Sequence, residues 1–232
     1  MNDCLAIIPA RGGSKRIPKK NIKFFCGKPI IYYSIKAALT SNCFDKVIVS
    51  TDDKTTAKIA LNYGAEVPFK RPKKLSNDKA TTSEVINHSI NFYKNKGINF
   101  NYVCCIYPTA PFLSKSNLIK GYNLIKQKKY DFVLTVTEYS HPIQRSFKIL
   151  KKGGLKIQNP KLMSKPTNNF EKIYHDAGKF YFGKCKSFLK KKLFFGKNSY
   201  PIILNKSVAQ DINDIEDWKI AESIFKNINI RF

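Results

Sequence analysis

Acidic side chains are scarce in this sequence. Its 232 residues include 16 Asp and Glu against 42 Lys and Arg, which gives a formal net charge of +26. Such an excess attracts anions at long range and suggests a nucleotide, an acidic sugar or a nucleic acid as ligand. The lysines are spread along the whole chain, so a solvated lysine-rich surface accounts for much of the charge equally well. No RNA-recognition signature or paired zinc-ligand spacing occurs, and we expect no nucleic-acid partner.

The sequence also lacks the features of secreted and membrane proteins. None of its six cysteines forms a C-x-x-C pair, which favours a reduced compartment. The apolar stretch at residues 5–10 is too short for a signal peptide and leads into Arg11. No segment approaches the length that spans a bilayer. We therefore expect a cytoplasmic protein with no membrane partner.

Hydrophobic residues make up 43% of the chain, enough for a sizeable core, and the length suits one domain covering residues 1–232. Short apolar runs alternate with amphipathic stretches. Strands are expected at 5–8, 47–49, 102–107 and 132–136, with helices at 29–39, 55–62, 81–94 and 116–126. This alternation predicts an α/β fold with a mostly parallel sheet and helices on both faces.

The alternation of expected strands and helices ends after Tyr139. Residues 147–150 and 155–157 flank two glycines and read as a hairpin, and 159–169 reads as a loop. Later strands are expected at 180–182 and 202–204, and a final helix at 214–225. We interpret residues 139–175 as an excursion from the main sheet that forms a lid or a dimer contact.

Cys104 and Cys105 are adjacent within an apolar run. Neighbouring strand residues point to opposite faces of a sheet, so this pair fits a buried strand better than a shared metal.

Four segments with polar and basic side chains are expected at the carboxyl ends of strands, at 9–21, 50–53, 108–111 and 210–214. Ligands bind beyond the carboxyl ends of strands in open α/β sheets, so we expect these four segments to meet in one crevice. After the second strand, Asp53 is expected to cap the next helix, whereas the role of Asp52 stays open.

The first segment contains a basic turn with paired glycines, Gly12 and Gly13. Glycines let backbone N–H groups approach phosphate oxygens, while Arg11 and Lys15 supply positive charge. The turn matches neither G-x-x-x-x-G-K-[ST] nor G-x-G-x-x-G, which disfavours a P-loop kinase and a Rossmann-type dehydrogenase. Taken alone, a tight turn with solvated cations explains it as well.

Longer segments resemble a known family. Residues 8–21 (IPARGGSKRIPKKN) are similar to the N-terminal signature of sugar-acid cytidylyltransferases, which include CMP-sialic acid synthetases. The segments 71–78 (RPKKLSND), 107–111 (YPTAP) and 210–213 (QDIN) resemble later motifs of the same family. Three details resemble one branch, the pseudaminic acid cytidylyltransferases: the YPTAP form, residues 145–147 (RSF) and residues 174–178 (YHDAG).

The resemblance implies a Rossmann-like nucleotidyltransferase fold, a dimerisation excursion and a homodimer. It implies transfer of CMP from CTP to a nine-carbon sugar acid with release of pyrophosphate, assisted by Mg²⁺. Arg11, Lys15 and Asp211 are the implied catalytic residues, with Asp211 and Asn213 as metal ligands. The residues implied to bind the nucleotide are Ala10, Gly12, Gly13, Ser14, Lys20, Asn21, Arg71, Pro108 and Thr109.

Two departures from the family pattern matter. Asn213 stands where a second acid is usual, and its amide oxygen brings no negative charge to a metal, although Asp214 is adjacent. Tyr107 stands where many relatives carry Gln.

For the sugar, Arg145 is the candidate cation for the carboxylate, and Tyr107, His175 and Asp176 complete the expected sugar contacts. A surface role for Arg145 and a structural polar pair for His175 and Asp176 are the plain alternatives.

Other functions stay open on the sequence alone. The sugar acid can be sialic acid, legionaminic acid or the shorter Kdo, because stereochemistry is recognised by a few pocket contacts. A nucleic-acid-binding module and an inactive nucleotide-binding relative are alternatives of a different class.

Overall fold

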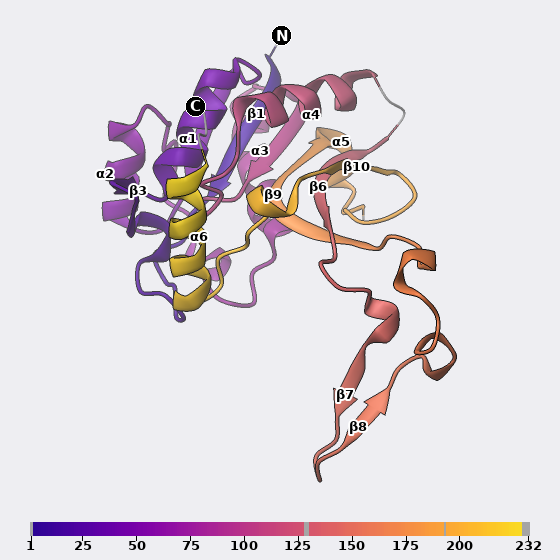
Figure 1. Ribbon diagram of the computed structural model, residues 1–232. Helices are drawn as coiled ribbons and strands as arrows, with labels where there is room; N and C mark the ends of the chain where they lie inside the picture. Colours follow the sequence, from indigo (N-terminus) through magenta and orange to yellow (C-terminus); the bar gives the residue numbers. More distant parts are fainter. Residues whose placement is uncertain (1, 128–129, 193, 229–232) are drawn as a thin grey trace.

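A six-stranded sheet forms the centre of the molecule in the computed structural model, which describes residues 2–127, 130–192 and 194–228 (Figure 1). Across the sheet lie β10 (Ser199–Ile203), β6 (Phe132–Glu138), β9 (Tyr174–Lys184), β5 (Phe100–Ile106), β1 (Asn2–Pro9) and β4 (Lys46–Ser50). Only β9 runs antiparallel to its neighbours β5 and β6. The expected mostly parallel sheet is confirmed.

Side chains of the central strands alternate between two hydrophobic cores. In β1, Cys4, Ala6 and Ile8 pack on one face of the sheet, and the intervening Leu5 and Ile7 pack on the other. The adjacent Cys104 and Cys105 of β5 separate in the same way, as the sequence predicted. Both strands are buried on both faces, which is typical of parallel sheets in α/β proteins.

Helices cover both faces of the sheet. The helices are α1 (Ile31–Ser41), α2 (Lys54–Asn62), α3 (Thr82–Lys94), α4 (Lys115–Gln127), α5 (Cys185–Leu189) and α6 (Ile215–Asn227). The core on one face includes side chains of α1 and α4, and the core on the other includes side chains of α3 and α5. Helix α6 packs through Trp218 on a third cluster beside the start of α1. The described helices include none with the length and apolar character needed to span a lipid bilayer.

Short elements complete the chain. They are the two-stranded sheet of β2 (Phe24–Phe25) and β3 (Lys28–Pro29), and the 3₁₀ turns η1 (Lys20–Ile22), η2 (Lys73–Leu75), η3 (Ile143–Arg145), η4 (Pro160–Leu162), η5 (Thr167–Asn169) and η6 (Lys206–Val208).

The chain leaves the main sheet after β6 and returns at β9. Between them β7 (Phe147–Ile149) and β8 (Leu155–Ile157) pair as the expected hairpin, with Gly153 and Gly154 at positive φ in its turn. Figure 1 shows this hairpin projecting away from the sheet. Its role as a lid or dimer contact, and the assignment of the whole chain to one domain, stay predictions.

Strand β9 is longer and less regular than the sequence indicated. Its pairing with β6 shifts register, so that Tyr181 lies opposite Leu134 whereas Asp176 lies opposite Val136. Gly178 lies within this irregular stretch at φ +59. Irregular strand segments re-aim side chains, and this one brings Asp176 back to the hydroxyl of Tyr181.

Candidate active site

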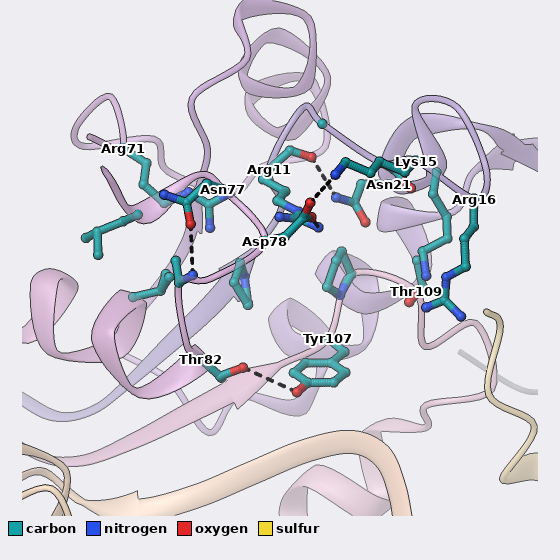
Figure 2. Close-up of a pocket in the computed structure, with 18 of the residues that line it drawn as sticks. Arg11, Lys15, Arg16, Asn21, Arg71, Asn77, Asp78, Thr82, Tyr107 and Thr109 are labelled. Atoms are coloured by element: carbon teal, nitrogen blue, oxygen red, sulfur yellow. Dashed lines mark hydrogen bonds and ion pairs between the residues drawn. The ribbon is translucent and has the colours of Figure 1, made fainter. Parts of the chain in front are cut away.

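A cavity of about 590 Å³ opens beyond the carboxyl ends of β1 and β5 (Figure 2). Residues expected to bind the nucleotide or the sugar supply much of its lining. From the basic turn come Arg11, Gly13, Ser14, Lys15, Lys20 and Asn21, and from later segments come Arg71, Tyr107, Pro108, Thr109 and Asn213. Three of the four segments expected in one crevice therefore meet here, while Asp52 and Asp53 line a smaller cavity behind the same turn.

Hydrogen bonds hold the basic turn in shape. Asn21 donates from Nδ2 to the carbonyl oxygen of Arg11 at 2.9 Å, and Gly12 donates its N–H to Asp52 Oδ1 at 3.0 Å. A Cβ on Gly12 would lie 2.8 Å from the Cβ of Asp53, so only glycine fits at this position. Asp53 caps α2 by accepting from the N–H of Thr56 at 2.7 Å, as expected. Gly12 thus faces the acidic segment behind the turn, and Gly13 faces the cavity.

Asp78 lies across the cavity from the basic turn, and sequence reasoning assigned it no role. It accepts from Arg11 Nη2 and from Lys15 Nζ, each at 2.6 Å. Figure 2 shows its carboxylate between these two cations. Hydrogen bonds from Lys15 and then Arg11 lower the pKa of Asp78, so the carboxylate is charged at neutral pH. Only one feature of the sequence pointed to Asp78, namely its position as the last residue of the motif at 71–78.

Arg71 is buried in the wall of the cavity, with its side chain 3% exposed. Its nearest charged partner is Asp52, at 3.7 Å from Nη2, and neither Nε nor Nη2 has a hydrogen-bond partner among the described residues. Burial lowers the pKa of Arg71, an effect that Asp52 opposes. A buried guanidinium with unused N–H groups fits a ligand that brings acceptor oxygens or nitrogens.

The distant C-terminal segment reaches the same cavity. Arg16 donates from Nη2 to Asn213 Oδ1 at 3.0 Å, and Lys20 donates from Nζ to the carbonyl oxygen of Ile212 at 2.8 Å. Asn213 in turn donates from Nδ2 to Asp211 Oδ2 at 2.7 Å. Burial lowers the pKa of Lys20, and the charge of Asp211 opposes this shift. The basic turn and Asp211 therefore belong to one connected site.

Asp211 and Asn213 offer oxygen ligands of the kind that Mg²⁺ prefers. Within the described ranges, no group of three or more His, Cys, Asp and Glu side chains is arranged to hold a metal by itself. The donor set fits an ion that takes one carboxylate from the protein and its other ligands from phosphate oxygens and water. Asp214 accepts from the N–H of Asp217 at 2.9 Å as the cap of α6, so it serves the helix.

Tyr107 lines the cavity and contacts Tyr181 of β9. Its hydroxyl lies 3.4 Å from Thr82 Oγ1, and its ring packs edge-on against Tyr181, 5.4 Å between centroids. The hydroxyl of Tyr181 donates to Asp176, and burial raises the pKa of both tyrosines. Asp176 also accepts from the N–H of Gly178 at 3.0 Å. Asp176 is thus connected to the cavity edge through two aromatic rings.

Six expected site residues do not line this cavity: Gly12, Asp176 and Asp211 connect to it through neighbouring residues, and Ala10, His175 and Arg145 lie elsewhere. Ala10 is fully buried in the core, and its N–H donates to the carbonyl oxygen of Ser50. His175 contacts the main-chain oxygen of Asp176 and the ring of Tyr139, without pairing with the Asp176 carboxylate.

Arg145 lies in the excursion and does not line the cavity. Its Nη2 donates to the carbonyl oxygen of Lys165 at 2.6 Å, and its guanidinium lies 5.8 Å from the ring of Phe170. Its role toward a sugar carboxylate stays a prediction, as does the sugar role of His175.

The fold and the cavity together define the class of protein. A mostly parallel α/β sheet carries a basic glycine turn after its first strand, and a cavity with many charged and polar lining residues lies beyond it. This arrangement is that of a nucleotidyltransferase. Residues 5–184 match the family model described as cytidylyltransferase, and the chain belongs to this family.

Individual relatives agree with the family. The chain is 40% identical to a pseudaminic acid cytidylyltransferase of Campylobacter jejuni over 96% of each chain. It is 34% identical to a CMP-N,N'-diacetyllegionaminic acid synthase of Legionella pneumophila, again over 96% of each. A solved structure of CMP:2-keto-3-deoxy-manno-octonic acid synthetase complexed with CTP superposes with a TM-score of 0.70 at 13% identity, covering 97% of this chain and 99% of the other. That similarity establishes the Rossmann-like fold.

Proposed function

We propose that this cytidylyltransferase transfers CMP from CTP to the anomeric hydroxyl of a nine-carbon sugar acid, pseudaminic acid. One observation carries the proposal: the basic turn around Arg11 and the segment around Asp211 meet at one cavity, joined by the contact of Arg16 with Asn213. The sugar is inferred from the 40% identity to the Campylobacter enzyme. Sialic, legionaminic and Kdo acids remain the alternatives.

The triphosphate of CTP would lie along the basic turn. Arg11 and Lys15 present their charged groups toward Asp78 in the cavity, where an incoming phosphate would replace the carboxylate. Ser14 and Gly13 line the same cavity. Asn21 and Lys20 support this arrangement, because one fixes the main chain at Arg11 and the other fixes the main chain at Ile212.

Arg71 and Thr109 are the residues we assign to the cytidine. Both line the cavity and both are buried, and Arg71 has unused N–H groups. A pyrimidine or ribose that accepts these hydrogen bonds would remove the cost of leaving a buried guanidinium unsatisfied. We expect cytidine to lie on this side and the triphosphate on the side of Lys15.

Asp211 is the proposed carboxylate ligand of Mg²⁺, and the amide oxygen of Asn213 would join it only by leaving Arg16, from which it accepts at 3.0 Å. When bound, the ion would neutralise triphosphate charge and stabilise the leaving pyrophosphate. In the transfer itself, the anomeric oxygen bonds to the α-phosphorus as the bond from that phosphorus to pyrophosphate breaks. The hydroxyl proton passes to water. The protein contributes chiefly by positioning the two substrates and by balancing charge.

A substrate panel tests the reaction and the sugar together. Purified protein is given CTP, Mg²⁺ and one of four acids, namely pseudaminic, legionaminic, sialic and Kdo, and pyrophosphate release is followed. We expect the highest kcat/KM with pseudaminic acid. A higher value with another acid would reassign the sugar, and no release with any acid would overturn the proposed function.

We also propose that the chain is a homodimer joined through the excursion. The hairpin exposes apolar side chains: Ile149 is 81% exposed, Leu155 59% and Phe147 52%. An isolated two-stranded hairpin is marginally stable in water, and exposed apolar patches mark association surfaces. A second copy that packs on β7 and β8 would cover them.

We place the protein in the cytoplasm. All six cysteines are free, and Cys4, Cys43, Cys104 and Cys105 are buried. Free thiols in these numbers fit a reducing compartment.

A further inference from the structure

Lys179 is a buried lysine in the middle of β9. Its exposed fraction is 1%, which places it among the largest fully buried side chains of the protein. A buried ammonium is costly unless polar groups compensate for its lost hydration. An apolar residue would fill the same space without the desolvation cost of a buried charge. The contacts of the ammonium group therefore indicate what it contributes.

The ammonium of Lys179 reaches the segment that carries Asp211. Nζ donates to the carbonyl oxygen of Gln210, the residue directly before Asp211, at 2.5 Å. This contact joins the central sheet to a stretch of chain without regular secondary structure, between η6 and α6. Ala209 and Ile212 pack in the hydrophobic core, and Lys179 and Lys20 add hydrogen bonds to the carbonyl oxygens of Gln210 and Ile212.

The main chain at Lys179 also supports the opposite wall of the cavity. Its carbonyl oxygen accepts from the N–H of Tyr107 at 3.0 Å. A carbon placed on the neighbouring Gly178 would lie 3.9 Å from the ring of Tyr107 and 4.0 Å from Asp211 Oδ1. The Asp211 carboxylate therefore lies close to this part of β9. Lys179 contacts both the Tyr107 side of the cavity, through its carbonyl oxygen, and the Asp211 segment, through Nζ.

The charges around Lys179 balance in part. Burial lowers its pKa to about 8, and the carboxylates of Asp211 and Asp176 oppose the shift. At neutral pH the group is still an ammonium, the form that donates most strongly to a carbonyl oxygen.

We propose that Lys179 is a positioning residue for Asp211: by holding the carbonyl of Gln210, its ammonium fixes the segment from Gln210 to Asn213 and so sets how tightly a divalent ion binds beside the nucleotide. The proposal rests on the proposed function, because it takes Asp211 as the metal ligand. Groups that orient metal ligands typically contribute ten- to a hundredfold to metal affinity.

The test measures metal binding directly and needs no turnover. Mn²⁺ binding is followed by electron paramagnetic resonance at about pH 7 with saturating α,β-methylene-CTP, which resists transfer. Lys179→Met keeps an unbranched side chain that is one heavy atom shorter, and it loses the donor. We expect the Kd for Mn²⁺ to rise roughly tenfold or more. Lys179→Gln, which keeps an N–H donor, should recover part of the loss.

Two controls separate positioning from general damage. Thr135→Val perturbs the same buried region, where Thr135 Oγ1 accepts from the N–H of Lys179, and it leaves the Gln210 contact in place. Mn²⁺ affinity should then stay near that of the wild type even if Tm falls. In an Asp211→Asn background, Lys179→Met should weaken Mn²⁺ binding little further.

Distinct outcomes overturn distinct claims. Unchanged Mn²⁺ affinity in both Lys179 variants would overturn the positioning role alone, as would an equal loss in Thr135→Val. An equal loss of nucleotide-analogue binding in EDTA, measured by calorimetry, would also overturn it, because the effect would then reach the whole cavity. If the wild type binds neither the analogue nor Mn²⁺, the proposed function fails, and this proposal fails with it.

Discussion

Arg16 and Asn213 lie 197 positions apart in the chain, and Arg16 Nη2 donates to Asn213 Oδ1 at 3.0 Å. The contact closes the cavity where the basic turn meets the C-terminal segment. Asn213 also donates to Asp211, so one amide joins a cation of the turn to the carboxylate proposed to bind the metal. Asn213 can accept from Arg16 and donate to Asp211 at once, whereas an ionised acid has no N–H to donate.

This arrangement predicts that Asn213→Asp makes stability depend on metal. The variant loses the donor to Asp211 and places two carboxylates together, so repulsion should lower Tm in EDTA. Mg²⁺ shared by the two acids should restore Tm, with a larger increase than in the wild type. Differential scanning fluorimetry across a Mg²⁺ titration measures both effects. Asn227→Asp, at the far end of α6, is the matched control, and an equal Mg²⁺ response in both variants would contradict the account.

Asp78 predicts a gain of anion affinity on mutation. Its carboxylate occupies Arg11 and Lys15, the two cations proposed for the triphosphate. Asp78→Asn removes this internal competitor, so α,β-methylene-CTP should bind several-fold tighter in EDTA. Arg11→Ala, the comparison variant, should bind it roughly tenfold more weakly or worse. Calorimetry at fixed ionic strength measures both, and weaker binding by Asp78→Asn would show that the carboxylate instead organises the two cations.

Lys179 predicts a stability change at alkaline pH. Its pKa is about 8 in the folded protein against 10.5 for an ordinary lysine. Between these values the unfolded chain binds a proton that the folded chain has released, so the free energy of unfolding rises with pH over this window. Lys179→Met should lack this rise. Urea unfolding of both proteins at about pH 7 and about pH 10 gives the change in the free energy of unfolding for each. Subtracting the change in the variant from that in the wild type cancels the titration of the other groups. Equal changes in the two proteins would refute the assignment.

The hairpin predicts a change of oligomeric state. Ile149→Asp places a charge on the most exposed apolar side chain of the excursion and should convert a dimer to monomers without lowering the Tm of the main domain. Sedimentation velocity distinguishes the two states. Lys152→Gln, in the turn of the same hairpin, changes the net charge by the same amount and is the matched control. A wild-type monomer, or a dimer that survives Ile149→Asp, would exclude association through β7 and β8.

Much of the sheet could be predicted because local pattern determines it. The apolar run around Ile7 stops at Pro9, and the pair Cys104 and Cys105 alternates across β5. The capping box of α3, formed by Thr81 and Glu84, also depends on neighbouring residues only. The antiparallel direction of β9 and its register shift depend on distant pairing with β6, and no local pattern marks them. Helix α5 was missed because five residues give too short a period.

The candidate site also contains some residues that local sequence predicts and others that only tertiary contacts reveal. The basic turn could be recognised from its glycines and cations, although the reason for Gly12 is the close approach of Asp53, which lies 41 positions later. The pairing of Asp78 with Arg11 and the burial of Lys179 are tertiary facts, because each residue taken alone reads as a solvated charge. Arg145 was assigned to the sugar carboxylate from its residue type, and within the excursion it donates to the carbonyl oxygen of Lys165, so its sugar role stays a prediction.

The most direct test of the central claim is anomalous diffraction from crystals soaked with Mn²⁺ and α,β-methylene-CTP. We expect a manganese peak beside the Asp211 carboxylate, in contact with a triphosphate that lies along Arg11 and Lys15. A nucleotide bound away from the basic turn, or a manganese peak remote from Asp211, would contradict the account.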